Sequence, residues 1–191
     1  MYRVVSSGYP FPKPYADFVA RLRVPMGFVL VMAFAWFAHP TIRALACGIP
    51  VSAAGLALRA WAAGHLAKNQ QLATGGPYAY LRNPLYVGTL LVALGLAVAA
   101  RSAWLAVLFA AVFLLVYLPA VMLEEQHLTK LFPEYARYAA TVPSLIPRRK
   151  PNPGQSHFQW RLYRKNQEYQ ALLGFAAGLA WLVFRALRFM P

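Results

Sequence analysis

The chain has 191 residues, of which 60% are hydrophobic and 13% are charged. Soluble domains carry about 25% charged residues, so this composition argues against a soluble globular domain and indicates a membrane protein. Nineteen Lys and Arg residues stand against five Asp and Glu residues. The basic residues flank apolar segments instead of forming one stripe, so we expect no nucleic-acid partner. Cys47 is the single cysteine, and the chain can therefore form no internal disulfide.

The apolar segments predict an all-α integral membrane protein with about five transmembrane helices. Residues 1–23 mix aromatic and basic side chains, which is typical of an interfacial lead-in at headgroup depth. The first span is expected at 24–38, where a helix would cover roughly 22 Å of a ~30 Å hydrocarbon core. The second is expected at 44–66, and its small residues Ala53-Ala54-Gly55 would let another helix approach closely.

The third and fourth spans are expected to form a tight antiparallel hairpin. The third, at 85–100, starts directly after Pro84, which suits the first turn of a helix. The very short turn Arg101-Ser102 joins it to the fourth span at 103–123. Pro119 is expected to kink this helix near its end.

Residues 124–168 are polar, and a fifth span is expected at 171–187. A helix lying flat at the interface is the alternative there, and its apolar continuity favours a spanning helix. With a cytoplasmic N-terminus, the inside segments 1–23, 67–84 and 124–168 hold fourteen basic residues against four outside. The positive-inside rule therefore predicts that the N-terminus and both polar regions are cytoplasmic.

Two polar groups should meet at that face. If the third helix starts at Pro84 and the fourth ends near residue 123, Arg82-Asn83 lies beside Glu124-Glu125. Adjacent carboxylates at the mouth of an apolar span are costly unless a cation or hydroxyls meet them. A salt bridge to Arg82 or Lys68, at a solvated helix end, is the plain structural interpretation; a ligand site is the other.

Further polar residues lead toward the same place. Arg59 lies inside the second span, where it either snorkels to the interface or serves a site. His65 and Lys68 follow one and two helical turns later, close to the same face. The remaining histidines show no metal-ligand spacing, and we predict no metal site.

The loop between the second and third spans reads GGPYAYLRNPLY. Gly75-Gly76-Pro77 predicts a tight turn whose backbone can approach a ligand. Tyr78, Tyr80 and Tyr86 are either interfacial anchors or the wall of a pocket for a cation.

Three motifs in order resemble the isoprenylcysteine carboxyl methyltransferase and phospholipid methyltransferase superfamily of integral-membrane enzymes. They are GPYAYLRNPLYVG, the glutamate pair, and LFPEYARYAATVPSLIP, and the resemblance covers roughly residues 55–147. Asn83 stands where the family usually has histidine, and Phe132-Pro133 replaces its Phe-Gly. Asn can hydrogen-bond but cannot titrate, so an acid–base role at that position is in doubt.

The resemblance implies that S-adenosylmethionine binds near the cytosolic face and that a membrane lipid or lipidated molecule accepts its methyl group. Together with the apolar segments, it places the methyltransferase-like core at 67–147 in one membrane domain over 1–191. The other parts of that domain are the interfacial lead-in (1–23), two N-terminal spans (24–66), a basic linker (148–170) and a C-terminal helix (171–191). Arg82 and Glu124 are the predicted catalytic residues. The predicted cofactor-binding residues are His65, Lys68, Gly76, Pro77, Tyr78, Arg82, Asn83, Tyr86, Glu124 and Glu125.

Several functions stay open at this point. A carboxyl acceptor, as in isoprenylcysteine, comes first, and a phospholipid amine comes second. An NADPH-dependent membrane sterol reductase shares part of the RNPLY-like pattern, but few basic residues lie near the loop to hold a 2′-phosphate. A non-catalytic membrane scaffold would bind no small molecule.

Overall fold

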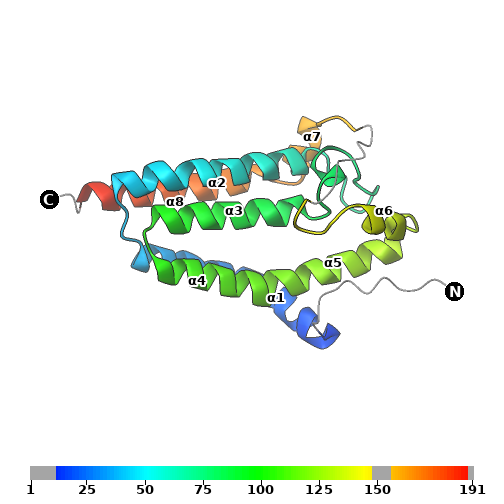
Figure 1. The fold of residues 1–191 in the computed structure, drawn as a ribbon, viewed down its shortest axis with the longest axis horizontal. Coiled ribbons are helices and arrows are strands. Elements are labelled where there is room, and N and C mark those ends of the chain that lie inside the picture. The colour runs from blue at the N-terminus through cyan, green and yellow to red at the C-terminus, as the bar shows by residue number, and fades with distance from the viewer. Residues whose placement is uncertain (1–11, 148–155, 189–191) are drawn as a thin grey trace.

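The computed structural model describes residues 12–147 and 156–188, and the regular structure within them is helical (Figure 1). The predicted all-α fold is therefore confirmed, whereas the predictions for 1–11, 148–155 and 189–191 lie outside the described residues. The helices are α1 (Lys13–Phe37), α2 (Ile42–Ala63), the 3-10 turn η1 (Gly76–Ala79), α3 (Pro84–Ala99), α4 (Ala103–Val112), the π-helical turn η2 (Phe113–Tyr117), α5 (Leu118–Leu131), α6 (Tyr135–Thr141), α7 (Trp160–Lys165) and α8 (Tyr169–Arg188).

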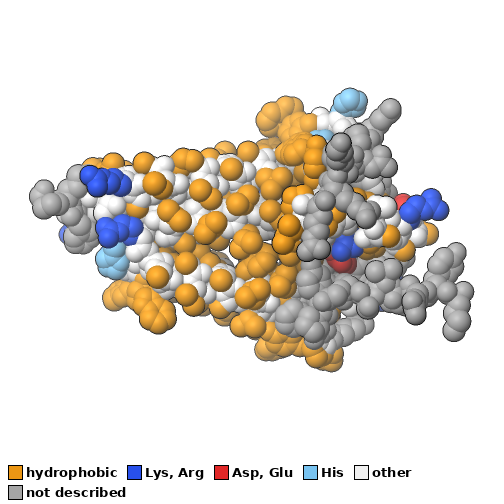
Figure 2. Space-filling model, in the orientation of Figure 1, with side chains coloured by type: hydrophobic (Ala, Val, Ile, Leu, Met, Phe, Trp, Pro, Cys, Tyr) orange, Lys and Arg blue, Asp and Glu red, His pale blue; other side chains and the backbone are white. Residues whose placement is uncertain are grey.

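Three of the described helices are long and apolar enough to cross a membrane: Ile42–Ala63, Ala103–Leu131 and Tyr169–Arg188. Two shorter apolar helices, Pro25–Phe37 and Pro84–Ala99, occupy the other two predicted spans. Figure 2 shows hydrophobic side chains over the middle of the bundle, with basic side chains at its two ends and acidic side chains at the right-hand end. This distribution is the one expected where lipid replaces water around the middle of the bundle.

The first helix is longer than the sequence predicts. α1 begins at Lys13 instead of Val24 and continues through Pro25. Its 25 residues give a helix of about 37 Å, but the apolar part is the shorter stretch Pro25–Phe37, so the expected shortfall against the hydrocarbon core is confirmed for the apolar part. Val19, in the part expected as a lead-in, is buried against Val112 and Val116. Packing on the fourth span thus extends the helix, which a reading of the first segment alone could not reveal.

Small residues bring α2 and α3 into close contact along their length. A Cβ atom at Gly48 would lie 2.3 Å from the Gly95 carbonyl oxygen, and one at Gly55 would lie 2.6 Å from the Gly88 carbonyl oxygen. Between these contacts, Ser52 Oγ donates a hydrogen bond to the Val92 carbonyl at 3.0 Å. The expected small-residue contact is therefore confirmed at Gly55, whereas Ala53 and Ala54 are exposed.

The tight hairpin of the third and fourth spans needs a correction. The turn itself is short, and Ser102 Oγ accepts a hydrogen bond from the Leu105 N–H at 3.4 Å to cap α4. Beyond the turn, however, α3 packs mainly on α2, whereas α4 packs on both α3 and α1. An apolar cavity lies between α3 and α4, also lined by α1 and α8. The small residues of α2 explain the difference, because they offer α3 a closer partner than the bulky face of α4.

The fourth span was expected to end near residue 123. It instead continues as α4, η2 and α5 to Leu131. The helix adopts its π turn directly before Pro119. Proline has no N–H and crowds the carbonyl four residues earlier, here that of Leu115, and a wider turn relieves this conflict. Tyr15 Oη of α1 donates a hydrogen bond to the Leu115 carbonyl at 2.8 Å. The defect made by Pro119 is thereby satisfied inside the bundle.

Candidate functional site

A polar cavity of about 350 Å³ lies at the end of the bundle where α3 begins and α5 ends. This volume is within the range of about 300–1,000 Å³ that is usual for small-molecule sites. Six of the residues predicted from the sequence line it: Lys68, Tyr78, Arg82, Asn83, Tyr86 and Glu124. Further lining residues, which the sequence did not single out for this site, include Asn69, Gln71, His127, Phe132, Tyr135 and Tyr138.

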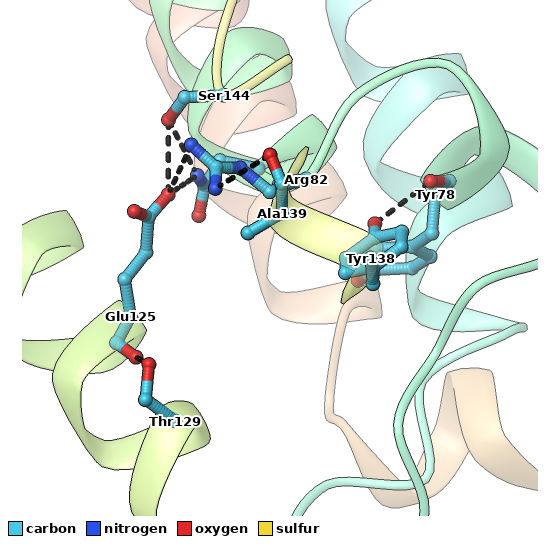
Figure 3. A network of polar contacts seen from close by, with 8 residues as sticks. Tyr78, Arg82, Glu125, Thr129, Tyr138, Ala139 and Ser144 are labelled. Atoms are coloured by element: carbon cyan, nitrogen blue, oxygen red, sulfur yellow. Dashed lines mark hydrogen bonds and ion pairs between the residues drawn. The ribbon is translucent and has the colours of Figure 1, made fainter. Parts of the chain in front are cut away.

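The predicted meeting of the loop with the glutamate pair is confirmed. Asn83 Nδ2 donates to Glu125 Oε1 at 2.9 Å, and Arg82 Nη2 lies 3.4 Å from the same oxygen. Ser144 Oγ also donates to this oxygen, at 3.1 Å, and accepts a hydrogen bond from Asn83 Nδ2. Figure 3 shows Glu125 reaching from its helix toward Arg82 and Ser144. Glu125 is 4% exposed, and a carboxylate so buried requires such donors.

Backbone hydrogen bonds hold the loop in place. The N–H groups of Arg82 and Asn83 donate to the carbonyls of Pro143 and Ser144, at 2.9 and 3.1 Å. The Arg82 Nη1 group also reaches the Ala139 carbonyl of α6, at 3.5 Å. The segment after α6 therefore fixes both residues immediately before α3 starts. The loop enters the site as a rigid element because its backbone, as well as its side chains, is bonded.

The two glutamates have different surroundings. Successive residues of a helix point about 100° apart, and here Glu125 is buried while Glu124 is exposed and lines the cavity. Tyr86 Oη donates a hydrogen bond to Glu124 Oε2 at 2.9 Å. Of the plain structural interpretation drawn from the sequence, the salt bridge to Arg82 is confirmed for Glu125, but Glu125 itself is buried and not solvated. Glu124 remains as the carboxylate that a ligand in the cavity can meet.

Two tyrosines of the cavity wall are held in the protonated form. Burial, with the nearby Glu124 charge, raises the pKa of Tyr78 well above its ordinary value of 10. Burial, with the neighbouring Tyr135, likewise raises the pKa of Tyr138. Tyr138 Oη donates to the Tyr78 carbonyl at 2.8 Å (Figure 3), whereas Tyr78 Oη has no hydrogen-bond partner among the described residues. The wall thus offers neutral phenols at physiological pH.

His65, Gly76 and Pro77 do not line the cavity, although the sequence placed them among the cofactor-binding residues. Gly76 has a φ of +57°, and a Cβ atom there would lie 2.6 Å from His65 Nε2. His65 is buried, and its Nδ1 atom is 2.8 Å from the Trp61 carbonyl. The structure therefore places this histidine behind the wall, where it supports the glycine turn. Glu125, as shown above, is likewise outside the lining.

One interpretation of the sequence was that Arg59 snorkels to the interface, and the structure shows that it does not. Its Nε and Nη2 atoms pair with the two carboxylate oxygens of Glu168, at 2.6 and 3.0 Å. Its Nη1 atom donates to Thr89 Oγ1 and, at 3.4 Å, to the Leu85 carbonyl of α3. Gly88 leaves the space for this crossing, since a Cβ atom there would lie 2.5 Å from Arg59 Cγ.

The partner, Glu168, falls in the predicted basic linker (148–170), and nothing in its local sequence marks it as a partner of Arg59. Asn166 Nδ2 holds the same segment against the end of α2, through the Ala63 and Leu66 carbonyls at 2.9 Å each. The charged pair therefore connects α2, α3 and the start of α8.

A second cavity, of about 630 Å³, lies within the bundle and is almost wholly apolar. Thr89 and Tyr117 are on its wall, with apolar residues of α1, α3, α4 and α8. Tyr117 packs against Tyr86, with ring centroids 6.3 Å apart in an edge-to-face arrangement. Because Tyr86 lines the polar cavity, this aromatic pair stands between the two cavities. The polar cavity and the apolar cavity thus meet at this aromatic pair.

Comparison with known proteins bears directly on the identity of this site. The profile of the phospholipid methyltransferase family matches residues 22–135. The chain belongs to the phospholipid methyltransferase family. Residues 22–135 include the apolar helices α2, α3, α4 and α5, together with the loop and glutamate pair of the polar cavity. This family membership confirms the resemblance found in the motifs, at the level of the superfamily.

Two curated relatives of this family member have names that concern metals. The chain is 39% identical over 92 residues to the cobalt-zinc-cadmium resistance protein CzcN of Cupriavidus metallidurans, covering 47% of this chain and 43% of the relative. It is 31% identical over 153 residues to the nickel-cobalt-cadmium resistance protein NccN of Alcaligenes xylosoxydans xylosoxydans, covering 72% and 70%. No solved structure gives a significant match.

Proposed function

We propose that the protein transfers a methyl group from S-adenosylmethionine to an acceptor held in the membrane. The observation that carries this proposal is the pair of adjoining cavities. The polar one presents the carboxylate of Glu124, the cations of Lys68 and Arg82, and aromatic rings. The apolar one meets it at Tyr86 and Tyr117. A polar cofactor and an apolar acceptor would each find a matching site, with their reactive ends at one boundary.

The residues of the polar cavity fit this cofactor. Its α-amino group and ribose hydroxyls suit the exposed Glu124, and its carboxylate suits Lys68. The aromatic faces of Tyr86 and Phe132 suit its sulfonium and adenine. When bound, the cofactor supplies a methyl group on a positively charged sulfur for in-line displacement. The protein's part is to position the acceptor, which is a large share of the acceleration in such reactions.

A reductase using NADPH fits less well. Arg82 is tied to Glu125 and to the Ala139 carbonyl, so its charge is largely committed within the protein. Lys68 is the remaining lysine or arginine on the described cavity wall. A 2′-phosphate normally needs a cluster of free cations.

The acceptor is proposed to be a lipid or a lipidated small molecule or peptide, with its chain in the apolar cavity and its polar end at Tyr86. The sequence ranked a carboxyl acceptor before a phospholipid amine. A carboxylate needs no base, whereas an amine must lose a proton before it attacks.

The names of CzcN and NccN describe resistance to metal ions in those proteins. In residues 12–147 and 156–188, no group of three or more His, Cys, Asp or Glu side chains could hold a metal ion. If this protein contributes to such resistance, we propose that it does so by modifying a lipid or lipid-linked molecule.

The direct test uses S-adenosylmethionine with a tritiated methyl group and the purified protein in vesicles made from host lipids. We expect tritium in the lipid extract, and much less with the Glu124→Gln variant. Mild base releases methanol from a methyl ester but leaves an N-methyl amine intact, so base treatment identifies the acceptor group. Absence of cofactor binding and of transfer, from a correctly folded protein, would refute the function.

A further inference from the structure

The helix α8 forms one wall of the apolar cavity and lies beyond residue 135, where the match to the family profile ends. Gly174, Ala177, Gly178 and Trp181 are its contribution to that wall. The family match therefore does not account for this side of the cavity.

Contacts at both ends hold α8 against the bundle. Directly before its start, Glu168 pairs with Arg59 of α2. Near its end, Arg185 Nη1 donates a hydrogen bond to the Ala35 carbonyl of α1 at 2.6 Å, and Leu182 is fully buried. The stretch that faces the cavity lies between these two attachments, so both of its ends are fixed in position.

Two glycines of α8 leave open space on the cavity side. A Cβ atom at Gly174 would have no described atom within 4 Å, and one at Gly178 would first meet Phe34 Cε1 at 3.9 Å. The glycines of α2 differ, because a Cβ atom at Gly48 or Gly55 would collide with the backbone of α3. The space beside α8 is therefore not used for close helix packing, and a side chain at either glycine would enter the cavity.

The apolar cavity has a polar end and a closed end. Thr89 of α3 and Tyr117 lie toward the polar cavity. Leu96 and Phe109 line the opposite end and pack against a cluster of buried residues. Leu96 follows Thr89 by seven positions on one helix, which corresponds to a depth of about 10 Å.

The two glycines lie at different depths. Gly178 is beside Phe34, which belongs to the buried cluster at the closed end. Gly174 is one helical turn nearer the segment that opens α8, which Arg59 connects to Thr89 at the polar end. Gly174 is therefore closer to the polar end than Gly178.

A hydrocarbon chain is the occupant that fits this cavity. Protein interiors are close-packed, and voids larger than a water molecule are few. Water is a poor occupant, because a buried water needs polar partners and this wall is almost wholly apolar. The solvent around the middle of the bundle is lipid. A chain whose polar end lies at Tyr117 brings that end to the side of the polar cavity.

We propose that Gly174 and Gly178 set how deep the acceptor's chain enters the apolar cavity, which makes them specificity-determining residues. This inference rests on the proposed methyl transfer. A depth of about 10 Å holds roughly eight carbons, because each C–C bond of about 1.5 Å advances an extended chain by about 1.3 Å. The substrate class that follows is a lipid with a flexible hydrocarbon chain, whose eight or so carbons nearest the polar end lie along α8.

The first experiment locates the chain without methyl transfer. The probe is 1-octanol with a photoreactive diazirine near its far end, added to the purified protein in detergent. We expect peptide mass spectrometry to find the label at the closed end, on Phe34, Leu96 or Phe109. Gly178→Leu should lower this labelling about tenfold, since added methylenes do not fit into filled space. Leu173→Trp is the matched control, because Leu173 is exposed on α8 and is not part of the cavity wall.

The second experiment measures transfer of the tritiated methyl group to vesicles of host lipids. Gly174→Leu and Gly178→Leu should each lower the initial rate about tenfold or more. Gly174→Leu should be the more severe, because it blocks the chain nearer its polar end. Affinity for S-adenosylmethionine should stay within about twofold of wild type, since neither glycine lines the polar cavity. Leu173→Trp should transfer at the wild-type rate.

The outcomes separate this inference from the proposed function. If the label on the wild type misses the closed end, the proposal is wrong, and this result does not depend on how any variant folds. It is also wrong if both leucine variants keep the wild-type labelling and rate, while methyl transfer itself stands. If the wild type is labelled at the closed end but binds no cofactor and transfers no methyl group, the proposed function fails and this inference fails with it.

Discussion

The two adjacent glutamates of α5 should respond in opposite ways to the same change. Glu125→Gln leaves an amide oxygen for Asn83 but removes the charge that faces Arg82, whose side chain is 14% exposed. Removing one partner of a buried charge pair costs about 3–5 kcal/mol. We expect the lower end, about 3 kcal/mol, because the amide oxygen still accepts a hydrogen bond.

Glu124→Gln is the matched control, one residue away. Glu124 is exposed, and its described contact is the hydrogen bond from Tyr86. We expect a cost in stability below about 1 kcal/mol. Loss of the cavity's carboxylate should instead weaken binding of S-adenosylmethionine about tenfold, which corresponds to about 1.4 kcal/mol.

Thermal unfolding in detergent, with and without the cofactor, measures both effects. In a chain of this length 1 kcal/mol shifts Tm by about 2–4 °C, so Glu125→Gln should lower Tm by about 6–12 °C and Glu124→Gln by little. Equal melting of the two variants would contradict the division of roles. Unchanged cofactor affinity in Glu124→Gln would remove that carboxylate from the site.

Three further predictions concern the scaffold. Gly95→Ala should destabilise the protein by several kcal/mol, because the added Cβ would lie 2.3 Å from Ser52 Oγ. Gly174→Ala is the control: its added Cβ would have no atom within 4 Å, so this variant should melt within a few degrees of wild type. Glu168→Gln should lower Tm because Arg59 loses its charged partner. Replacing both residues by apolar ones, Arg59→Met with Glu168→Leu, should recover much of the lost stability. No recovery in the double variant would show that the pair does more than stabilise the fold. The free energy of unfolding should also fall as pH rises above about 10. Tyrosines of the unfolded chain then lose protons, whereas Tyr78 and Tyr138 retain theirs in the folded protein. Tyr138→Phe should make this fall smaller when Tm is measured over a series of pH values.

The apolar blocks of the sequence were sufficient to predict the helices, because each block must satisfy its backbone internally in lipid. The pairing of those helices was not predictable in the same way. The sequence favoured α3 with α4 from the shortness of their turn. The contact of Gly48 with Gly95, which favours α3 with α2, becomes visible only when two helices are set side by side.

The candidate site was predictable where two polar segments lie at the ends of neighbouring helices, at the same end of the bundle. The link between Asn83 and Glu125 follows from the hairpin and the motif order, although forty-two positions separate them. Glu168 and Ser144 could not be predicted, because their partners come from distant segments and no local pattern marks them. His127 did carry a usable signal, since it lies three residues after Glu124 on the same helix and so on a neighbouring part of its surface.

The central claim is that the polar cavity binds S-adenosylmethionine. Titration calorimetry on the detergent-purified protein tests it most directly, with the cofactor, its demethylated product and NADPH as ligands. We predict one site for the first two ligands, weakened about tenfold by Glu124→Gln and unaffected by His39→Gln. Heat of binding from NADPH alone, or from none of the three ligands, would contradict the account.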